Sequence, residues 1–147
     1  MTPDASALYI DTSCLLKLFV REPESPRVVE LLGSESQVVV SELARLEAET
    51  QLRARLLGGL LTKSKHDKLV RELTATLMLE PFRVEPVPSD AFERARTVSA
   101  RTKVHCRTLD LLHVATMDCA GLTRLLTNDS AQAAVARSLG IATVMPR

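Results

Sequence analysis

Four acidic residues stand within or beside apolar stretches, at places where a folded chain usually puts apolar side chains: Asp11, Glu47, Asp110 and Asp129. An ionised carboxylate removed from water is costly unless it is paired or binds a cation. Four carboxylates held together also repel one another, and a divalent metal bound by oxygen ligands is the simplest compensation. The pattern therefore indicates metal-assisted chemistry on phosphate esters.

Asp11 and Asp129 each follow a short apolar run that predicts a β-strand. In parallel α/β sheets, ligands bind at the carboxyl ends of strands, so both acids are expected to meet there. A second interpretation is helix capping, because aspartate is among the preferred cap residues. Asp11 or Thr12 could cap the helix that follows, and Asp129 could form a capping box with Gln132.

Asp110 lies in the first turn of the apolar segment 109–120, a pattern typical of a buried helix. The helix dipole stabilises such a carboxylate by only ~0.3–1 kcal/mol. This is small beside the cost of burying an unpaired charge, so a strong partner is required. Arg107 is one candidate and a metal is the other. His113 is expected to be packed and hydrogen-bonded rather than a ligand, because Mg²⁺ and Mn²⁺ prefer oxygen.

Helical phase separates Glu47 from the neighbouring Glu42 and Glu49. At about 100° per residue, Glu47 falls on the apolar side of the predicted helix, while the other two fall on its flank as solvated charges. The predicted apolar stripe comprises Leu43, Thr50 and Ala54. The alternative for Glu47 is a boundary residue whose stem packs while its carboxylate reaches water.

The composition is that of an ordinary globular protein. The 147 residues suit one domain, 1–147, with a single substantial core. Hydrophobic residues make up 46% and charged residues 25%. No uncharged apolar stretch is long enough to cross a bilayer, so we expect no membrane segment.

The expected location is the cytoplasm, because the first residues lack the basic start and apolar run of a secretory signal. The three cysteines point the same way. Cys14, Cys106 and Cys119 are odd in number and form no CxxC pair, which argues against a disulfide framework or a zinc site.

Basic residues are concentrated in one stretch, although the net charge is only +1. The segment 94–107 contains no acidic residue and carries Arg94, Arg96, Arg101, Lys103, His105 and Arg107. Such a run could follow a phosphate backbone or form a solvated helix face and loop. Aromatic residues are only 3%, which disfavours a sheet that stacks bases on aromatic rings.

Strand-like and helix-like segments alternate along the whole chain, which predicts an α/β fold with a mostly parallel sheet. We expect a three-layer α/β/α sandwich. The predicted strands are 7–10, 37–40, 82–87, 123–127 and 142–145, and the predicted helices are 12–20, 26–33, 42–57, 64–79, 89–101, 107–120 and 131–139. Gly58-Gly59 breaks the central helical stretch, and Ser64 with Asp67 is placed as a capping box. Strand 82–87 is expected at an edge, because prolines flank it.

The order and spacing of the acidic motifs are more specific than any one of them. In chain order they are Ile10-Asp11-Thr12-Ser13, Ser41-x5-Glu47, Arg107-Thr108-Leu109-Asp110-x2-His113-x-Ala115 and Thr127-Asn128-Asp129. This series resembles the PIN-domain ribonucleases, and within them the VapC-type toxins of VapBC toxin–antitoxin systems. The resemblance runs from about Leu8 to Val144.

The resemblance implies a metal-dependent endoribonuclease that acts as a toxin, cleaves RNA and inhibits translation. The positions of Asp11, Glu47, Asp110 and Asp129 would form an acidic pocket for Mg²⁺ or Mn²⁺. Residues Thr12, Ser13, Thr127 and Asn128 would support it. Glu47 would either bind directly or orient a water molecule, and the four acids do not decide between one ion and two. Arg107 would contact the substrate phosphate, or else pair structurally with Asp110.

The resemblance also implies partners. A cognate antitoxin would insert a segment near the acidic pocket, and the chain would form a homodimer with the hairpin around Gly58-Gly59 near one of these contacts. The competing hypothesis is a non-catalytic PIN-like binding module whose pocket docks a basic peptide. Only the nuclease predicts RNA cleavage that disappears on chelation. The sequence does not identify the RNA that is cut.

Overall fold

Five short strands form a single sheet in the order β3-β2-β1-β4-β5, and every pairing is parallel. The structure is a computed structural model that describes residues 3–147. The strands are β1 (Leu8–Ile10), β2 (Val38–Ser41), β3 (Phe82–Glu85), β4 (Arg124–Leu126) and β5 (Ala142–Val144). As the flanking prolines predicted, β3 lies at an edge of the sheet.

Seven helices connect the strands within residues 3–147. They are α1 (Thr12–Leu16), α2 (Ser25–Gly33), α3 (Glu42–Leu57), α4 (Lys63–Leu77), α5 (Ala91–Arg101), α6 (Thr108–Ala120) and α7 (Ser130–Ser138). None of these helices has the length and apolar character needed to cross a membrane.

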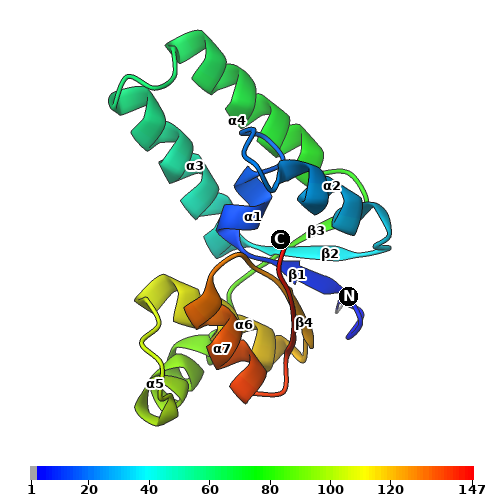
Figure 1. Cartoon of the computed structure of the whole chain (residues 1–147), viewed down its shortest axis with the longest axis vertical. Helices are drawn as coiled ribbons and strands as arrows, with labels where there is room; N and C mark the ends of the chain where they lie inside the picture. Colours follow the sequence, from blue (N-terminus) through cyan, green and yellow to red (C-terminus); the bar gives the residue numbers. More distant parts are fainter. Residues whose placement is uncertain (1–2) are drawn as a thin grey trace.

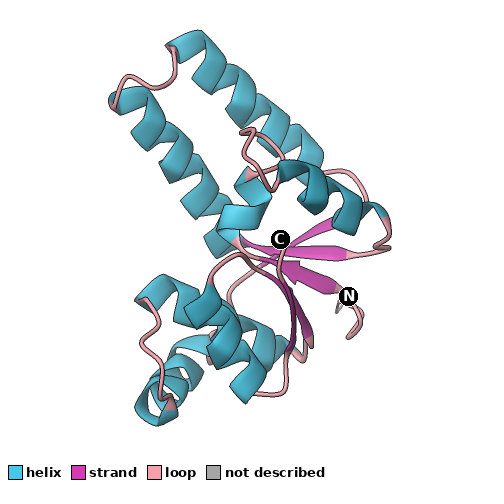
Figure 2. Ribbon diagram, in the orientation of Figure 1, coloured by secondary structure: helices cyan, strands magenta, loops and turns pink. Residues whose placement is uncertain are grey.

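The helices lie on both sides of the sheet, as Figures 1 and 2 show, with α1 to α4 on one side and α5 to α7 on the other. Alternation along β1 explains the two cores, because successive side chains of a strand point to opposite faces. Leu8 and Ile10 pack in the core with α1 to α4, whereas Tyr9 packs in the core with α5 to α7. The predicted three-layer α/β/α sandwich is confirmed.

Two local predictions were wrong. The first helix ends at Leu16 instead of Val20, because the chain continues in tight turns in which Leu18 and Phe19 donate to carbonyls three residues earlier. The predicted capping box at Ser64 does not form. Thr62 caps α4 by accepting from Lys65 N at 3.2 Å, and Asp67 pairs with Lys63 and His66. The other predicted ends lie within two residues of the observed ones.

The helices α3 and α4 form a long hairpin that projects from the sheet (Figure 1). Gly58 ends α3, and Gly59 adopts a positive φ of 79°, a conformation that glycine reaches at little cost. At the hairpin tip, Leu57 and Leu60 are 74% and 76% exposed.

The strand order reverses at β1, which lies between β2 and β4. After β1 the chain adds β2 and β3 along one edge of β1, and it later adds β4 and β5 along the opposite edge. Because Ile10 pairs with Leu126 and Asp11 N donates to Leu126 O at 3.1 Å, the ends of the two strands lie side by side. This is the position at which parallel α/β sheets bind ligands.

Candidate active site

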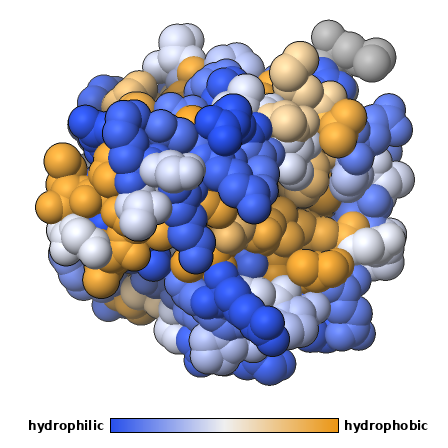
Figure 3. Space-filling view, turned by 90° about the horizontal axis from the view of Figure 1, so that it is seen from above, coloured by the Kyte–Doolittle hydropathy of each residue, from blue (hydrophilic) through white to orange (hydrophobic). Residues whose placement is uncertain are grey.

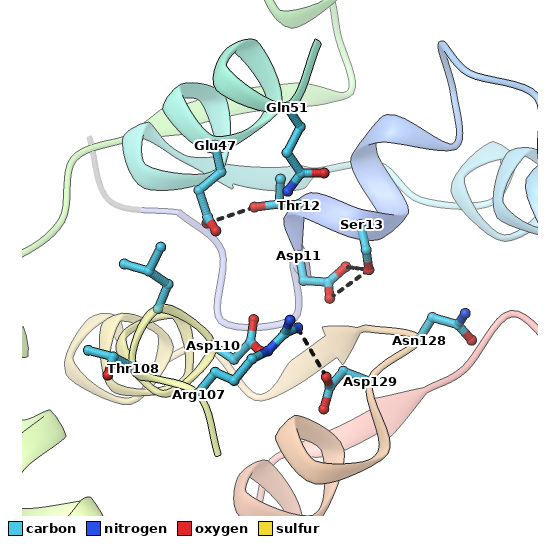
Figure 4. Close-up of a pocket in the computed structure, with 11 residues that line it drawn as sticks. Asp11, Thr12, Ser13, Glu47, Gln51, Arg107, Thr108, Asp110, Asn128 and Asp129 are labelled. Carbon is cyan, nitrogen blue, oxygen red and sulfur yellow. Dashed lines mark hydrogen bonds and ion pairs between the residues drawn. The ribbon is translucent and has the colours of Figure 1, made fainter. Parts of the chain in front are cut away.

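An open pocket of about 460 Å³ lies at the carboxyl ends of the central strands (Figure 4). Its walls contain the four acids that the sequence singled out, although they come from four separate segments of the chain. The lining residues are Asp11, Thr12, Ser13, Glu47, Gln51, Arg107, Thr108, Leu109, Asp110, Asn128 and Asp129. Gln51 was missed by the sequence analysis, and its signal was its place one helical turn after Glu47.

Asp11 is the most buried of the four acids, at 4% exposure. One carboxylate oxygen accepts from Cys14 N at 2.9 Å and so caps α1, and the other accepts from Thr127 Oγ1 at 2.8 Å. Ser13 Oγ lies 3.1 Å from both oxygens. Burial raises the pKa of Asp11 and outweighs these hydrogen bonds, which lower it. Asp11 thus caps α1 and also lines the pocket.

Asp129 also caps a helix, because its Oδ1 accepts from Gln132 N at 2.8 Å at the start of α7. The reciprocal half of the predicted capping box is wrong. The buried side chain of Gln132 turns inward instead, where Oε1 accepts from Thr127 Oγ1 at 2.6 Å and Nε2 donates to Asp110 O at 3.0 Å. Gln132 thus links the end of β4 to the first turn of α6.

Arg107 joins two of the acids. Its Nε donates to Asp110 Oδ2 at 2.8 Å, and its Nη2 lies 3.4 Å from Asp129 Oδ2 (Figure 4). The arginine side chain is 75% exposed, whereas those of the two aspartates are 17% and 29% exposed. The hydrogen bond with Asp110 raises the pKa of Arg107. Exposed pairs of this kind contribute about 0–1 kcal/mol, so the guanidinium can leave at little cost.

Glu47 does reach the pocket, although the apolar stripe predicted for its helix was wrong. The buried face of α3 is formed by Ala44, Ala48 and Leu52, whereas Thr50 and Ala54 are exposed. The buried stripe of α3 is therefore rotated about the helix axis from the predicted one. Glu47 lies at the border of this buried stripe and is partly buried. Glu42 is exposed, and Glu49 pairs with Arg45 at 3.4 Å, as expected of solvated charges.

His113 lies directly behind Glu47. The imidazole is 1% exposed, and its Nε2 lies 2.6 Å from Glu47 Oε1, which also accepts from Thr12 Oγ1 at 2.8 Å. The expectation of a packed, hydrogen-bonded histidine is confirmed. Burial raises the pKa of Glu47, but the hydrogen bonds from His113 and Thr12 lower it, and the net pKa lies below its ordinary value.

The donor set of the pocket suits a hard divalent cation, because carboxylate and hydroxyl oxygens are the ligands that Mg²⁺ and Mn²⁺ prefer. As the side chains stand within residues 3–147, no three His, Cys, Asp or Glu groups are close enough to hold one ion. In this arrangement the Arg107 guanidinium bridges Asp110 and Asp129. If this exposed side chain moved away, Oδ2 of Asp110 and Oδ2 of Asp129 would both be available to a cation.

The basic segment 94–107 divides into two parts. Arg94 pairs with Asp118 and Arg96 pairs with Glu93, so the charges on α5 are partly neutralised. From the end of α5 onward, Arg101, Lys103 and His105 are exposed and form no ion pair with any described residue. Only this second part, which leads to Arg107, offers free positive charge.

The molecule is thus an α/β/α sandwich with a parallel five-stranded sheet and four carboxylates at its topological switch point, the place where such sheets bind ligands. The chain matches the PIN domain over residues 8–138 and belongs to the PIN-domain family.

Similar proteins agree with this placement. Ribonuclease VapC46 of Mycobacterium tuberculosis is 34% identical over 143 residues, which is 96% of this chain and 98% of that protein. The crystal structure of VapC20 of M. tuberculosis, described as a sarcin–ricin loop cleaving toxin, has a TM-score of 0.70 at 21% identity and covers 87% of this chain and 94% of its own. A toxin–antitoxin complex from Klebsiella pneumoniae has a TM-score of 0.67 at 21% identity, with 97% and 98% covered.

Proposed function

We propose that the protein is a divalent-metal-dependent RNA endonuclease and the toxin of a toxin–antitoxin pair. One observation carries the chemistry. Four carboxylates from separate segments line a pocket whose only cationic side chain among the described residues is Arg107, an excess of three negative charges when all are ionised. Such an excess is stabilised by a bound divalent cation.

Asp11, Asp110 and Asp129 are proposed as the principal metal ligands, with Glu47 as a fourth ligand or as a group that orients water. A bound Mg²⁺ or Mn²⁺ would polarise the scissile phosphate and activate water for attack. Ser13 and Thr127 keep Asp11 in place through their hydroxyl groups. Asn128 lines the same wall beside Asp129.

Arg107 is proposed to bind a substrate phosphate. Its guanidinium is a fixed positive charge with several donors, a geometry suited to phosphate oxygens. In the structure it neutralises Asp110 and Asp129, and a metal in the pocket would take over that task and release it. The exposed cations Arg101 and Lys103 lie shortly before Arg107 in the chain and support a nucleic-acid substrate.

RNA is the proposed nucleic acid because the relative with 34% identity is named a ribonuclease. The similar solved structures include a toxin–antitoxin complex, which supports a protein antitoxin as partner. Inhibition of translation is proposed as the consequence of RNA cleavage. We propose that the antitoxin inserts a segment near the acidic pocket. A homodimer is proposed as well, and the exposed leucines at the tip of the α3–α4 hairpin are suited to one of these contacts.

The deciding experiment measures cleavage of RNA by the purified protein with Mg²⁺, with Mn²⁺ and with excess EDTA. Cleavage is expected only with metal, and added Mg²⁺ should restore it after chelation. The matched control is Asp11→Asn, which should be inactive under every condition and so exclude a contaminating nuclease. Full activity in excess EDTA, absent from the control, would overturn the metal mechanism, and no cleavage at all would favour the binding module.

A further inference from the structure

A buried chain of polar groups stands behind Glu47 and lines no part of the pocket itself. Tyr9 OH lies 2.6 Å from His113 Nδ1, and His113 Nε2 lies 2.6 Å from Glu47 Oε1. Tyr9 is fully buried at the centre of β1, and His113 is 1% exposed on α6. This series of hydrogen-bonded side chains therefore connects β1, through Tyr9, to α6, through His113, and then to Glu47 on α3.

The proton positions in this series follow from the chemistry of its three groups. Glu47 Oε1 is a carboxylate oxygen and accepts, so His113 Nε2 must carry a proton. A neutral imidazole then has an unprotonated Nδ1, which accepts from the Tyr9 hydroxyl. In this arrangement each of the three groups has a partner, as buried polar groups require. The Tyr9 hydroxyl can thus donate to Nδ1 and hold the imidazole in the orientation that donates to Glu47.

The result is an asymmetric carboxylate. Oε1 of Glu47 accepts from both His113 and Thr12, whereas Oε2 accepts no hydrogen bond from residues 3–147. Figure 4 shows the Glu47 side chain extending from α3 into the pocket, with the bond to Thr12 on one side. The two donors hold one oxygen and leave the other free to face the pocket.

We propose that His113, oriented by Tyr9, is a positioning residue that fixes Glu47 so that Oε2 is presented to the metal. The proposal rests on the proposed function, because it assigns Glu47 to the metal site. Partners that orient a ligand from behind are needed for affinity, and their loss typically weakens metal binding about 10–100-fold. A purely structural pair would affect folding and leave metal affinity unchanged.

The test measures Mn²⁺ affinity by calorimetry and thermal unfolding without metal, for the full chain and single variants. His113→Leu should raise the Mn²⁺ dissociation constant about 10–100-fold. His113→Gln places an amide donor near the former Nε2 and should recover part of the affinity. Tyr9→Phe removes only the hydroxyl and should weaken binding less than His113→Leu. The control is His66→Gln, a second buried histidine, which pairs with Asp67 on α4 away from the pocket.

A double variant separates positioning from a general loss of structure. If His113 acts through Glu47, then His113→Leu combined with Glu47→Gln should bind Mn²⁺ no more weakly than Glu47→Gln alone. Fully additive losses would overturn the proposal. So would wild-type affinity in folded Tyr9→Phe, and this conservative variant decides the matter should His113→Leu fail to fold.

Nitrogen-15 NMR of the wild-type imidazoles gives a readout that needs no metal. His113 is expected to carry a proton on Nε2, and a proton on Nδ1 alone would overturn the proposal. Wild-type protein that bound no Mn²⁺ would instead overturn the proposed function together with this inference. Wild-type binding with unaffected His113 variants would overturn the positioning role alone.

Discussion

Arg107 donates a 2.8 Å hydrogen bond to Asp110, one helical turn later, and so an exposed cation lines an otherwise acidic pocket. Arg107→Gln should change the free energy of unfolding by less than ~0.5 kcal/mol, because the side chain is exposed. Binding of Mn²⁺ should be retained or tightened, since a competing positive charge is removed. The KM for RNA should rise severalfold, as expected for one lost phosphate contact.

Calorimetry and steady-state cleavage at saturating metal measure the two effects separately. Arg96→Gln is the control, because Arg96 is an exposed arginine whose partner is Glu93 on the same helix. Weaker Mn²⁺ binding with an unchanged KM would show that Arg107 organises the carboxylates and does not contact substrate.

Asp11→Asn should abolish cleavage while preserving the fold. Asparagine can still cap α1, and its amide can donate to Thr127 Oγ1, whose single hydroxyl proton now faces two acceptors, Asp11 and Gln132. Removing a buried charge also relieves repulsion in the pocket. Stability without metal should therefore hold or rise.

Thermal unfolding with and without Mn²⁺ checks this prediction. The wild type should gain stability on adding metal, because a ligand that binds only the native state stabilises it. Asp11→Asn should gain much less. An equal gain in both proteins would remove Asp11 from the set of ligands.

Glu47→Gln should lose at least about tenfold in cleavage at matched Mg²⁺ with little change in packing, because the substitution keeps the shape and removes the charge. Glu42→Gln and Glu49→Gln are the matched controls on the same helix and should remain close to wild type. An active Glu47→Gln beside an inactive control would mean that a different glutamate serves the pocket.

Glu35→Gln tests an ion pair far from the pocket. Arg124 donates from Nη1 and Nη2 to the two oxygens of Glu35, and this bond lowers the pKa of Glu35. A lowered native pKa contributes stability above the ordinary glutamate value and loses it as the pH falls through the lowered one. Wild type should thus exceed Glu35→Gln by about 1 kcal/mol at neutral pH. The difference should vanish in acid, as denaturant titrations at several pH values would show.

Co-expression with the product of a neighbouring short reading frame should yield a stable complex, and the free protein should run as a dimer. Light scattering over a wide concentration range and co-purification measure these two points. A monomer at every concentration would contradict the dimer and leave the nuclease proposal intact.

The sequence by itself was enough to predict the order of the strands and helices and to single out the four acids that line the pocket. Both predictions depend on patterns within short stretches of the chain. Apolar runs, prolines and glycines located the strands and helices, and the adjacent ends of β1 and β4 bring Asp11 and Asp129 into one pocket. Asp11 and Asp129 also cap helices as their neighbours predicted. A cap involves only three or four residues, so its signal is contained in the local sequence.

Only the tertiary structure decided the contacts that join distant segments. The face of α3 that is buried depends on what packs against Ala44 and Ala48, and helical phase alone chose a different stripe. His113 meets Tyr9 and Glu47 across separations of 104 and 66 residues, and no local pattern encodes such a meeting. These pairings follow from the stacking of helices on a twisted sheet, where long-range packing outweighs the weak preferences of single residues.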